Sequence, residues 1–294
     1  MPPSQAAIGS LAQTACTWEV LARKAGNVCP GREFPDLRVA DFLASADAIA
    51  PILEEALLQP LGITILRCIH ETRKVVNTNT NLGIVLLLAP LASVPQDKPL
   101  RPGVADVLAR TTVDDSRNAY AAIRLAQPGG LGQVPDQDVR DEPTLRLRDV
   151  MALAQDRDLI AAQFATDFAL VLDLAEVALV QSVRKHGNIE RSIIELQLYL
   201  LSRKGDDLIR RKLADQAGVY RELADKILDG LETPMGRRAY LEFDAYLRAD
   251  NHARNPGTTA DLIAAVLFVA LRENMIALTT PFMWDDHPFA SAPI

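Results

Sequence analysis

The polar-to-apolar change that decides the fold lies in VVNTNTNLGIVLLLAP, residues 75–90. Small polar residues from Asn77 to Asn81 directly precede one of the most apolar runs in the chain. A long apolar run without strand-like alternation predicts a buried helix. A single Asn or Thr side chain is enough to cap the first turn of such a helix. Five in succession, followed by Gly83, therefore predict a second role for this helix entrance.

The pattern outside this stretch is also helical. Ala and Leu dominate, and no Asn-Gly or Asp-Gly turn separates two alternating runs, so a β-sheet is not expected. We predict one all-α domain over residues 16–280, with a flexible segment at 1–15 and an irregular, Pro-rich tail at 281–294. Helices are expected within 41–57, 61–76, 104–126, 144–187 and 189–248, with a buried helix after Asn255.

Composition and charge narrow the class of protein. The formal charge of −7, from 31 basic and 38 acidic residues, argues against a nucleic-acid partner bound through bulk electrostatics. Three cysteines without metal-ligand spacing and no secretory signal predict a reduced, cytoplasmic protein. The apolar runs are too short or interrupted to span a membrane. Small-molecule partners are expected, and a homodimer is compatible with the sequence.

Several familiar enzyme motifs do not occur in the sequence. There is no phosphate-binding G-x-x-x-x-G-K-[ST] loop, and the glycine-rich run at 129–132 follows a helix rather than a strand. The four histidines lack zinc-ligand spacing, and no G-x-S-x-G elbow indicates an acyl-transfer enzyme.

Polar clusters at expected helix ends remain, and each has an ordinary explanation as a helix cap or a solvated charge. Together they are typical of an all-α protein that presents backbone amides to phosphate oxygens, beside carboxylates that could hold Mg²⁺. A polyphosphate ligand explains them most simply. The clusters are residues 18–30, with Glu19, Lys24, Gly26 and Asn27; residues 32–46, with Asp36 and Asp41; residues 70–83, with Glu71, Asn77, Asn79, Thr80, Asn81 and Gly83; residues 114–132, with Asp114 and Asp115; and residues 254–265, with Asn255, Gly257, Thr258, Thr259 and Asp261.

In their order along the chain, these clusters make the sequence similar to the triphosphoribosyl-dephospho-CoA synthase family. The resemblance extends from about Glu19 to Glu273, and it is closest to a divergent branch found in archaea and methylotroph-like bacteria. The matching residues are Glu19, Val20, Lys24, Gly26 and Val28; Asp36, Asp41, Phe42, Ser45 and Ala46; Asn79, Thr80 and Gly83; and Pro256, Gly257, Thr259, Ala260, Asp261 and Leu262.

The chain also departs from the family pattern. The family has an Asp-Thr-Asn segment shortly before a basic-Gly turn, whereas here LVQS precedes Arg184–Gly187, so a carboxylate is missing. Leu82 replaces a Lys of the family's Asn-Thr segment.

The resemblance implies a reaction in which the ribose 2′-hydroxyl of 3′-dephospho-CoA displaces adenine from C1′ of ATP, with Mg²⁺ as cofactor. It implies that Lys24 balances phosphate charge and that Glu19, Glu71 and Asp261 are candidates for catalysis. Asp36, Asp41, Glu71 and Asp261 are candidates for metal binding, and the amides, hydroxyls and glycines of the clusters for nucleotide binding. Two alternatives stay open: another hydroxyl acceptor, such as a tetrahydromethanopterin precursor, or a non-catalytic nucleotide-binding scaffold.

Overall fold

A computed structural model describes residues 6–129, 132–213 and 218–291 of the chain. Throughout these ranges the regular structure is helical, and strand pairing is limited to two isolated bridges, Cys29 with Arg32 and Phe34 with Leu37. The all-α class predicted from the sequence is confirmed.

The first half of the chain forms helices close to the predicted ranges. They are α1 (Ile8–Leu21), α2 (Val39–Glu54), η1 (Ala56–Leu58), α3 (Leu61–Val75), α4 (Leu82–Ala92), α5 (Leu100–Ala109) and α6 (Val113–Ala126). Residues 8–15, which the sequence assigned to a flexible segment, form the first part of α1 because Ile8, Leu11 and Ala15 are buried in the core. Residues 1–5 of that segment lie outside the described ranges.

The second half combines short helices with three long ones. They are α7 (Leu147–Ala152), α8 (Leu159–Ala165), α9 (Ala169–Asp173), η2 (Leu174–Leu179), α10 (Val180–His186), α11 (Ile189–Arg203), α12 (Asp207–Lys212), α13 (Val219–Gly230), α14 (Pro234–His252), α15 (Gly257–Arg272) and η4 (Pro288–Ser291). The long ones are α11, α14 and α15. The region 144–187 is broken because Asp158 caps a new helix and because Asp167 and Phe168 adopt left-handed backbone angles.

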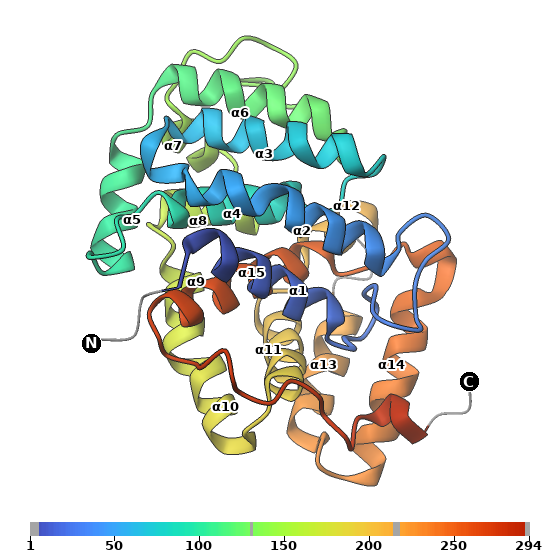
Figure 1. Ribbon diagram of the computed structural model, residues 1–294. Helices are drawn as coiled ribbons and strands as arrows, with labels where there is room; N and C mark the ends of the chain where they lie inside the picture. Colours follow the sequence, from blue (N-terminus) through green and yellow to red (C-terminus); the bar gives the residue numbers. More distant parts are fainter. Residues whose placement is uncertain (1–5, 130–131, 214–217, 292–294) are drawn as a thin grey trace, which may run out of the picture.

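Helices α4 and α15 form the centre of the larger core. Every α15 residue from Leu262 to Leu271 is buried, and so are nearly all residues of α4. Figure 1 shows α15 between two groups of helices, with α2, α3, α4 and α6 on one side and α10, α11 and α13 on the other. Because water is excluded from both helices over their length, their N-termini are held rigidly.

A smaller core lies between α11, α13 and α14. Its aromatic members are Tyr220, Tyr240, Phe243 and Trp284, all of them nearly or fully buried. Near its C-terminal end α14 leaves helical geometry at Ala249–Asn251, and this kink directs the chain back toward the start of α15. No helix within the described ranges combines the length and the apolar character needed to cross a bilayer.

Candidate active site

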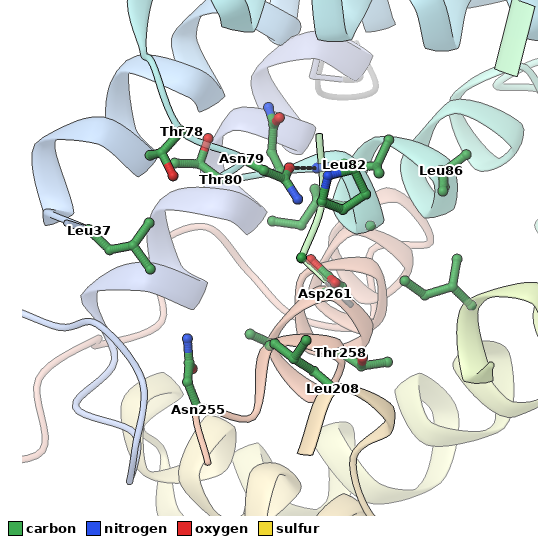
Figure 2. A pocket seen from close by; sticks show the side chains of 18 of the residues that line it. Leu37, Thr78, Asn79, Thr80, Leu82, Leu86, Leu208, Asn255, Thr258 and Asp261 are labelled. Atoms are coloured by element: carbon green, nitrogen blue, oxygen red, sulfur yellow. Dashed lines mark hydrogen bonds between the residues drawn. The ribbon is translucent and has the colours of Figure 1, made fainter. Parts of the chain in front are cut away.

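A cavity of about 440 Å³ opens where the two groups of helices meet at α15. This volume lies within the range of small-molecule and cofactor sites. Segments far apart in the sequence converge on it, and Figure 2 shows side chains from α4, α12 and α15 around one space. The predicted site residues that line it are Glu19, Asn27, Asp36, Asn79, Thr80, Asn81, Gly83, Asn255, Gly257, Thr258 and Asp261.

The polar residues before α4 each have a distinct partner. Asn79 accepts a hydrogen bond from the Leu82 backbone N–H at 3.1 Å, which caps the helix. The Thr80 hydroxyl lies 2.6 Å from the Ser45 hydroxyl of α2. Asn81 donates to the Thr72 hydroxyl at 2.9 Å, and its buried Oδ1 has no hydrogen-bond partner among the described residues. Asn77 is exposed and outside the cavity wall.

Gly83 is required by the approach of Asp261. A Cβ at position 83 would lie 2.1 Å from Oδ2 of Asp261, far inside a normal contact distance. The Asp261 carboxylate accepts a hydrogen bond from the Ile84 backbone N–H, and it keeps part of its surface open to the cavity. Burial raises the pKa of Asp261 well above its usual range, and the nearby Glu19 carboxylate raises it further.

Lys24 supports Glu19 rather than lining the cavity. The Lys24 side chain is fully buried, and its Nζ lies 2.9 Å from Oε1 of Glu19. The same ammonium group donates to the Glu19 carbonyl oxygen and, at 3.4 Å, to that of Ala22. An ammonium group has three donors, so none is left for a phosphate. Lys24 is therefore the counter-charge of Glu19 and is not part of the cavity wall.

The turn that carries Lys24 is held from two other helices. Gln197 of α11 accepts from the Ala25 N–H at 3.1 Å and donates to the carbonyl oxygen of Ala25 and to Oδ1 of Asn27, both at 2.8 Å. Asp244 of α14 accepts from the Gly26 N–H at 2.8 Å. Gly26 has a φ of +72° and packs against Leu247, so its role is to form the turn.

The N-terminus of α15 is already capped by a carboxylate. Asp206 accepts from the backbone N–H and the hydroxyl of Thr259, at 2.7 and 2.8 Å. Its other oxygen accepts from Leu208 and Ile209, so one side chain caps both α12 and α15. The amide of Thr259 is therefore not open to phosphate, contrary to expectation. At the start of α4 the amides of Leu82 and Ile84 are also occupied, because they donate to the side chains of Asn79 and Asp261.

Positive charge reaches the cavity from α12. Arg211 and Lys212 line it, and Arg211 lies 3.4 Å from Asp158, the N-cap residue of α8. Sequence reasoning missed all three residues, although the run Arg210–Lys212 is a visible signal. At the rim, Asp36 lies 3.4 Å from His252.

The remaining predicted residues lie away from the cavity. Asp41 accepts from the Arg38 N–H at 3.0 Å in the first turn of α2. Glu71 pairs with Lys74 at 2.6 Å on the exposed face of α3. Asp115 forms a capping box with Thr112 at the start of α6. The Arg184–Gly187 turn, where the sequence lacks a family carboxylate, is also absent from the cavity wall.

The donor set at the cavity fits a divalent cation that prefers oxygen. Glu19 and Asp261 offer carboxylates, and Asn81 Oδ1 is a buried acceptor without a partner in the part of the chain that the structure describes. Mg²⁺ is usually held by one or two carboxylates together with substrate phosphates. Elsewhere His186, Glu195 and Glu232 also converge, but Arg191 pairs with both glutamates and supplies their counter-charge.

Carboxylates, amides and a basic helix end around one cavity in an all-α domain are the groups that a nucleotide-dependent transferase needs. The sequence profile of the ATP:dephospho-CoA triphosphoribosyl transferase family matches residues 5–279. The chain belongs to this family of transferases, as its sequence motifs predicted.

A solved structure supports the assignment. The chain is similar to the crystal structure of a "putative triphosphoribosyl-dephospho-coA synthase from Archaeoglobus fulgidus", with 28% sequence identity and a TM-score of 0.64. The likeness covers 80% of this chain and 100% of the archaeal one. Among curated proteins no significant relative is found.

Proposed function

We propose that the protein transfers the triphosphoribosyl group of ATP to a hydroxyl of 3′-dephospho-CoA and releases adenine. The observation that carries this proposal is the meeting of Glu19 and Asp261, from α1 and α15, in one cavity with the basic end of α12. Family membership supports ATP as the donor. The acceptor and the released base are the parts that experiment must test.

The triphosphate binds at Arg211 and Lys212. Along the described part of the cavity wall these two residues, with His252, are the side chains able to carry positive charge. Lys24 is excluded because its ammonium group is buried against Glu19. ATP carries several negative charges near neutral pH, so charge-assisted hydrogen bonds to α12 fix the triphosphate end.

Asp261 and Asn81 would hold Mg²⁺, and the ion would neutralise triphosphate charge that two basic side chains leave uncompensated. Without a cation, the carboxylates on this wall would repel the substrate. Calorimetric titration with ATP in the presence and in the absence of Mg²⁺ should therefore show binding that requires the metal. Equal binding under both conditions would refute this part.

Glu19 performs the chemistry in this proposal. Its carboxylate, fixed by Lys24, accepts the proton of the acceptor hydroxyl as the hydroxyl oxygen bonds to C1′, and the bond between C1′ and N9 of adenine breaks. The departing base keeps the electron pair of that bond and takes up a proton. Positive charge develops on the ribosyl ring during transfer, and the negative charge of Glu19 stabilises it. Asp261, fixed by the Ile84 N–H, is positioned for the ion.

An apolar wall completes the cavity. It includes Leu37, Phe42, Leu82, Leu86 and Ile160, and it offers a surface for the purine ring of ATP. Figure 2 shows Leu82 and Leu86 on α4, on the same side of the pocket view as the start of α15 with Asp261.

The acceptor is tested by mass spectrometry of the product. Incubation with Mg-ATP and dephospho-CoA should yield dephospho-CoA enlarged by one triphosphoribosyl group. A cell extract supplies other acceptors in a parallel reaction. Transfer with extract but not with dephospho-CoA would contradict the proposed acceptor, and no transfer with either would contradict transferase activity by this chain.

A further inference from the structure

We propose that residues 281–289, here called the strap, form a positioning element of the active site. The strap holds the turn at residues 22–27, and through Lys24 it fixes Glu19 against the cavity. The profile of the family ends its match at residue 279, so the strap lies beyond the matched region. The inference extends the proposed function, because it assigns a part of the chain that sets the geometry of a proposed catalytic carboxylate.

The strap is anchored on the first turn of α11. The backbone N–H of Ile189 donates to the Pro281 carbonyl oxygen at 2.9 Å, and that of Glu190 donates to Phe282 at 3.0 Å. Two amides at this helix start, which have no partner within the helix, are satisfied in this way. In return the Trp284 N–H donates to Oε2 of Glu190 at 2.8 Å. Figure 1 shows the C-terminal segment crossing in front of α11.

Arg23 connects the strap to the turn. Its guanidinium group pairs with both oxygens of Glu190, at 2.6 and 2.7 Å, and donates to the Trp284 carbonyl oxygen at 2.8 Å. The Arg23 backbone N–H also donates to Glu190, at 3.1 Å. Side chain and backbone of Arg23 are thus fixed by the same carboxylate that fixes the strap.

His287 holds the other side of Arg23. Its Nε2 lies 3.0 Å from the Arg23 carbonyl oxygen, and its Nδ1 accepts from the Phe289 N–H at 3.0 Å. A carbonyl oxygen can only accept, so the proton is on Nε2 and the ring is neutral. His287 is 1% exposed and Trp284 6%, with Arg191 stacked over the Trp284 ring at 4.8 Å. These contacts are those of a packed element rather than a loose tail.

Arg23 is linked to the cavity through the next residue in the sequence. Lys24 directly follows Arg23, and its buried ammonium group contacts Glu19 at 2.9 Å. The Arg23 carbonyl oxygen accepts a second hydrogen bond from the Tyr240 hydroxyl at 2.9 Å, so removing the bond from His287 loosens this end of the turn without freeing it. A displacement of about 1 Å in a catalytic group can lower a rate by roughly 100-fold.

The test compares His287→Ala with His287→Gln and with Asp285→Ala, an exposed residue of the same strap. We expect His287→Ala to lower kcat for adenine release by about tenfold or more. KM for ATP should stay within about twofold, because the phosphates bind at α12. Gln retains a donor toward Arg23 and should restore most of the rate, while Asp285→Ala should match wild type.

A double-mutant cycle separates positioning from general loosening of the fold. In a Glu19→Gln background, the His287→Ala change should cause little further loss, because it acts through Glu19. Equal losses in both backgrounds, or an unchanged kcat in His287→Ala, would overturn the proposal.

Hydrogen exchange tests the strap independently of catalysis. In His287→Ala the amides of Ala25 and Gly26 should exchange at least about tenfold faster, while those of α3 remain as in wild type. Unchanged protection at residues 22–27 would overturn the strap proposal even if adenine is released. A third outcome separates the two proposals. If wild-type protein releases no adenine, the proposed function fails; if residues 22–27 nevertheless lose protection in His287→Ala, the strap still holds the turn.

Discussion

His287 should make the stability of the protein depend on pH, and the size of the effect follows from its surroundings. Burial, and to a smaller extent the positive charge of Arg23, lower the pKa of His287 to about 3, against the opposing effect of Glu190. In the unfolded chain the histidine pKa returns to roughly 6.5. As the pH falls below 6.5, His287 therefore binds a proton in the unfolded state but not in the folded state.

The contribution of His287 to the free energy of unfolding is complete above pH 6.5 and is lost between pH 6.5 and 3. Each pH unit within this window changes the free energy by about 1.4 kcal/mol, so the loss between pH 7 and pH 5 is about 2 kcal/mol. Asp207 acts in the opposite direction, because burial raises its pKa to about 6. The prediction therefore concerns the difference between wild type and His287→Gln, in which position 287 does not titrate.

Urea denaturation at pH 7 and pH 5 measures this difference. Wild type should lose about 2 kcal/mol more than His287→Gln between the two pH values. The same pH dependence in both proteins would show that burial does not keep His287 neutral in the folded protein, and would refute the reasoning. Asp285→Ala should retain the wild-type dependence, since Asp285 is exposed on the same segment.

Three further predictions concern the cavity. Gly83→Ala should destabilise the protein by about 1–3 kcal/mol in urea denaturation and reduce adenine release, because its Cβ would displace the Asp261 carboxylate; Gly132→Ala, with open space at its Cβ, should match wild type. Arg211→Ala with Lys212→Ala should raise KM for ATP by roughly tenfold or more in steady-state kinetics, whereas Arg238→Ala, on the exposed face of α14, should not. Asp261→Asn should lower kcat by roughly 100-fold, while Glu71→Gln, on the exposed face of α3, should leave it within about twofold; a large loss in Glu71→Gln would place the reaction elsewhere.

The helices were predictable from the sequence because they depend on local pattern. The apolar runs of α4 and α15 allowed only burial, and small polar residues before each run indicated where the two helices begin. Asn79 and Asp261 both line the cavity, at the N-terminal ends of these two buried helices.

The roles of individual charged residues were less predictable. Lys24 is buried against Glu19 and does not line the cavity, in a turn held by Gln197 and Asp244, which are more than 170 positions distant along the chain. Glu71 and Arg211 both occur in charge-rich helical stretches, and only tertiary packing decides which helix face meets the cavity. The periodicity of apolar residues predicts that a helix has a polar face, but it does not predict what that face contacts.

The bond of ATP that breaks tests the central claim most directly. After incubation of wild-type protein with Mg-ATP and acceptor, chromatography separates adenine, AMP, ADP and inorganic phosphate. Cleavage at C1′ predicts free adenine in a one-to-one ratio with acceptor consumed, no ADP, and loss of the adenine signal in Asp261→Asn. Formation of ADP without adenine would show a phosphotransferase and contradict the account.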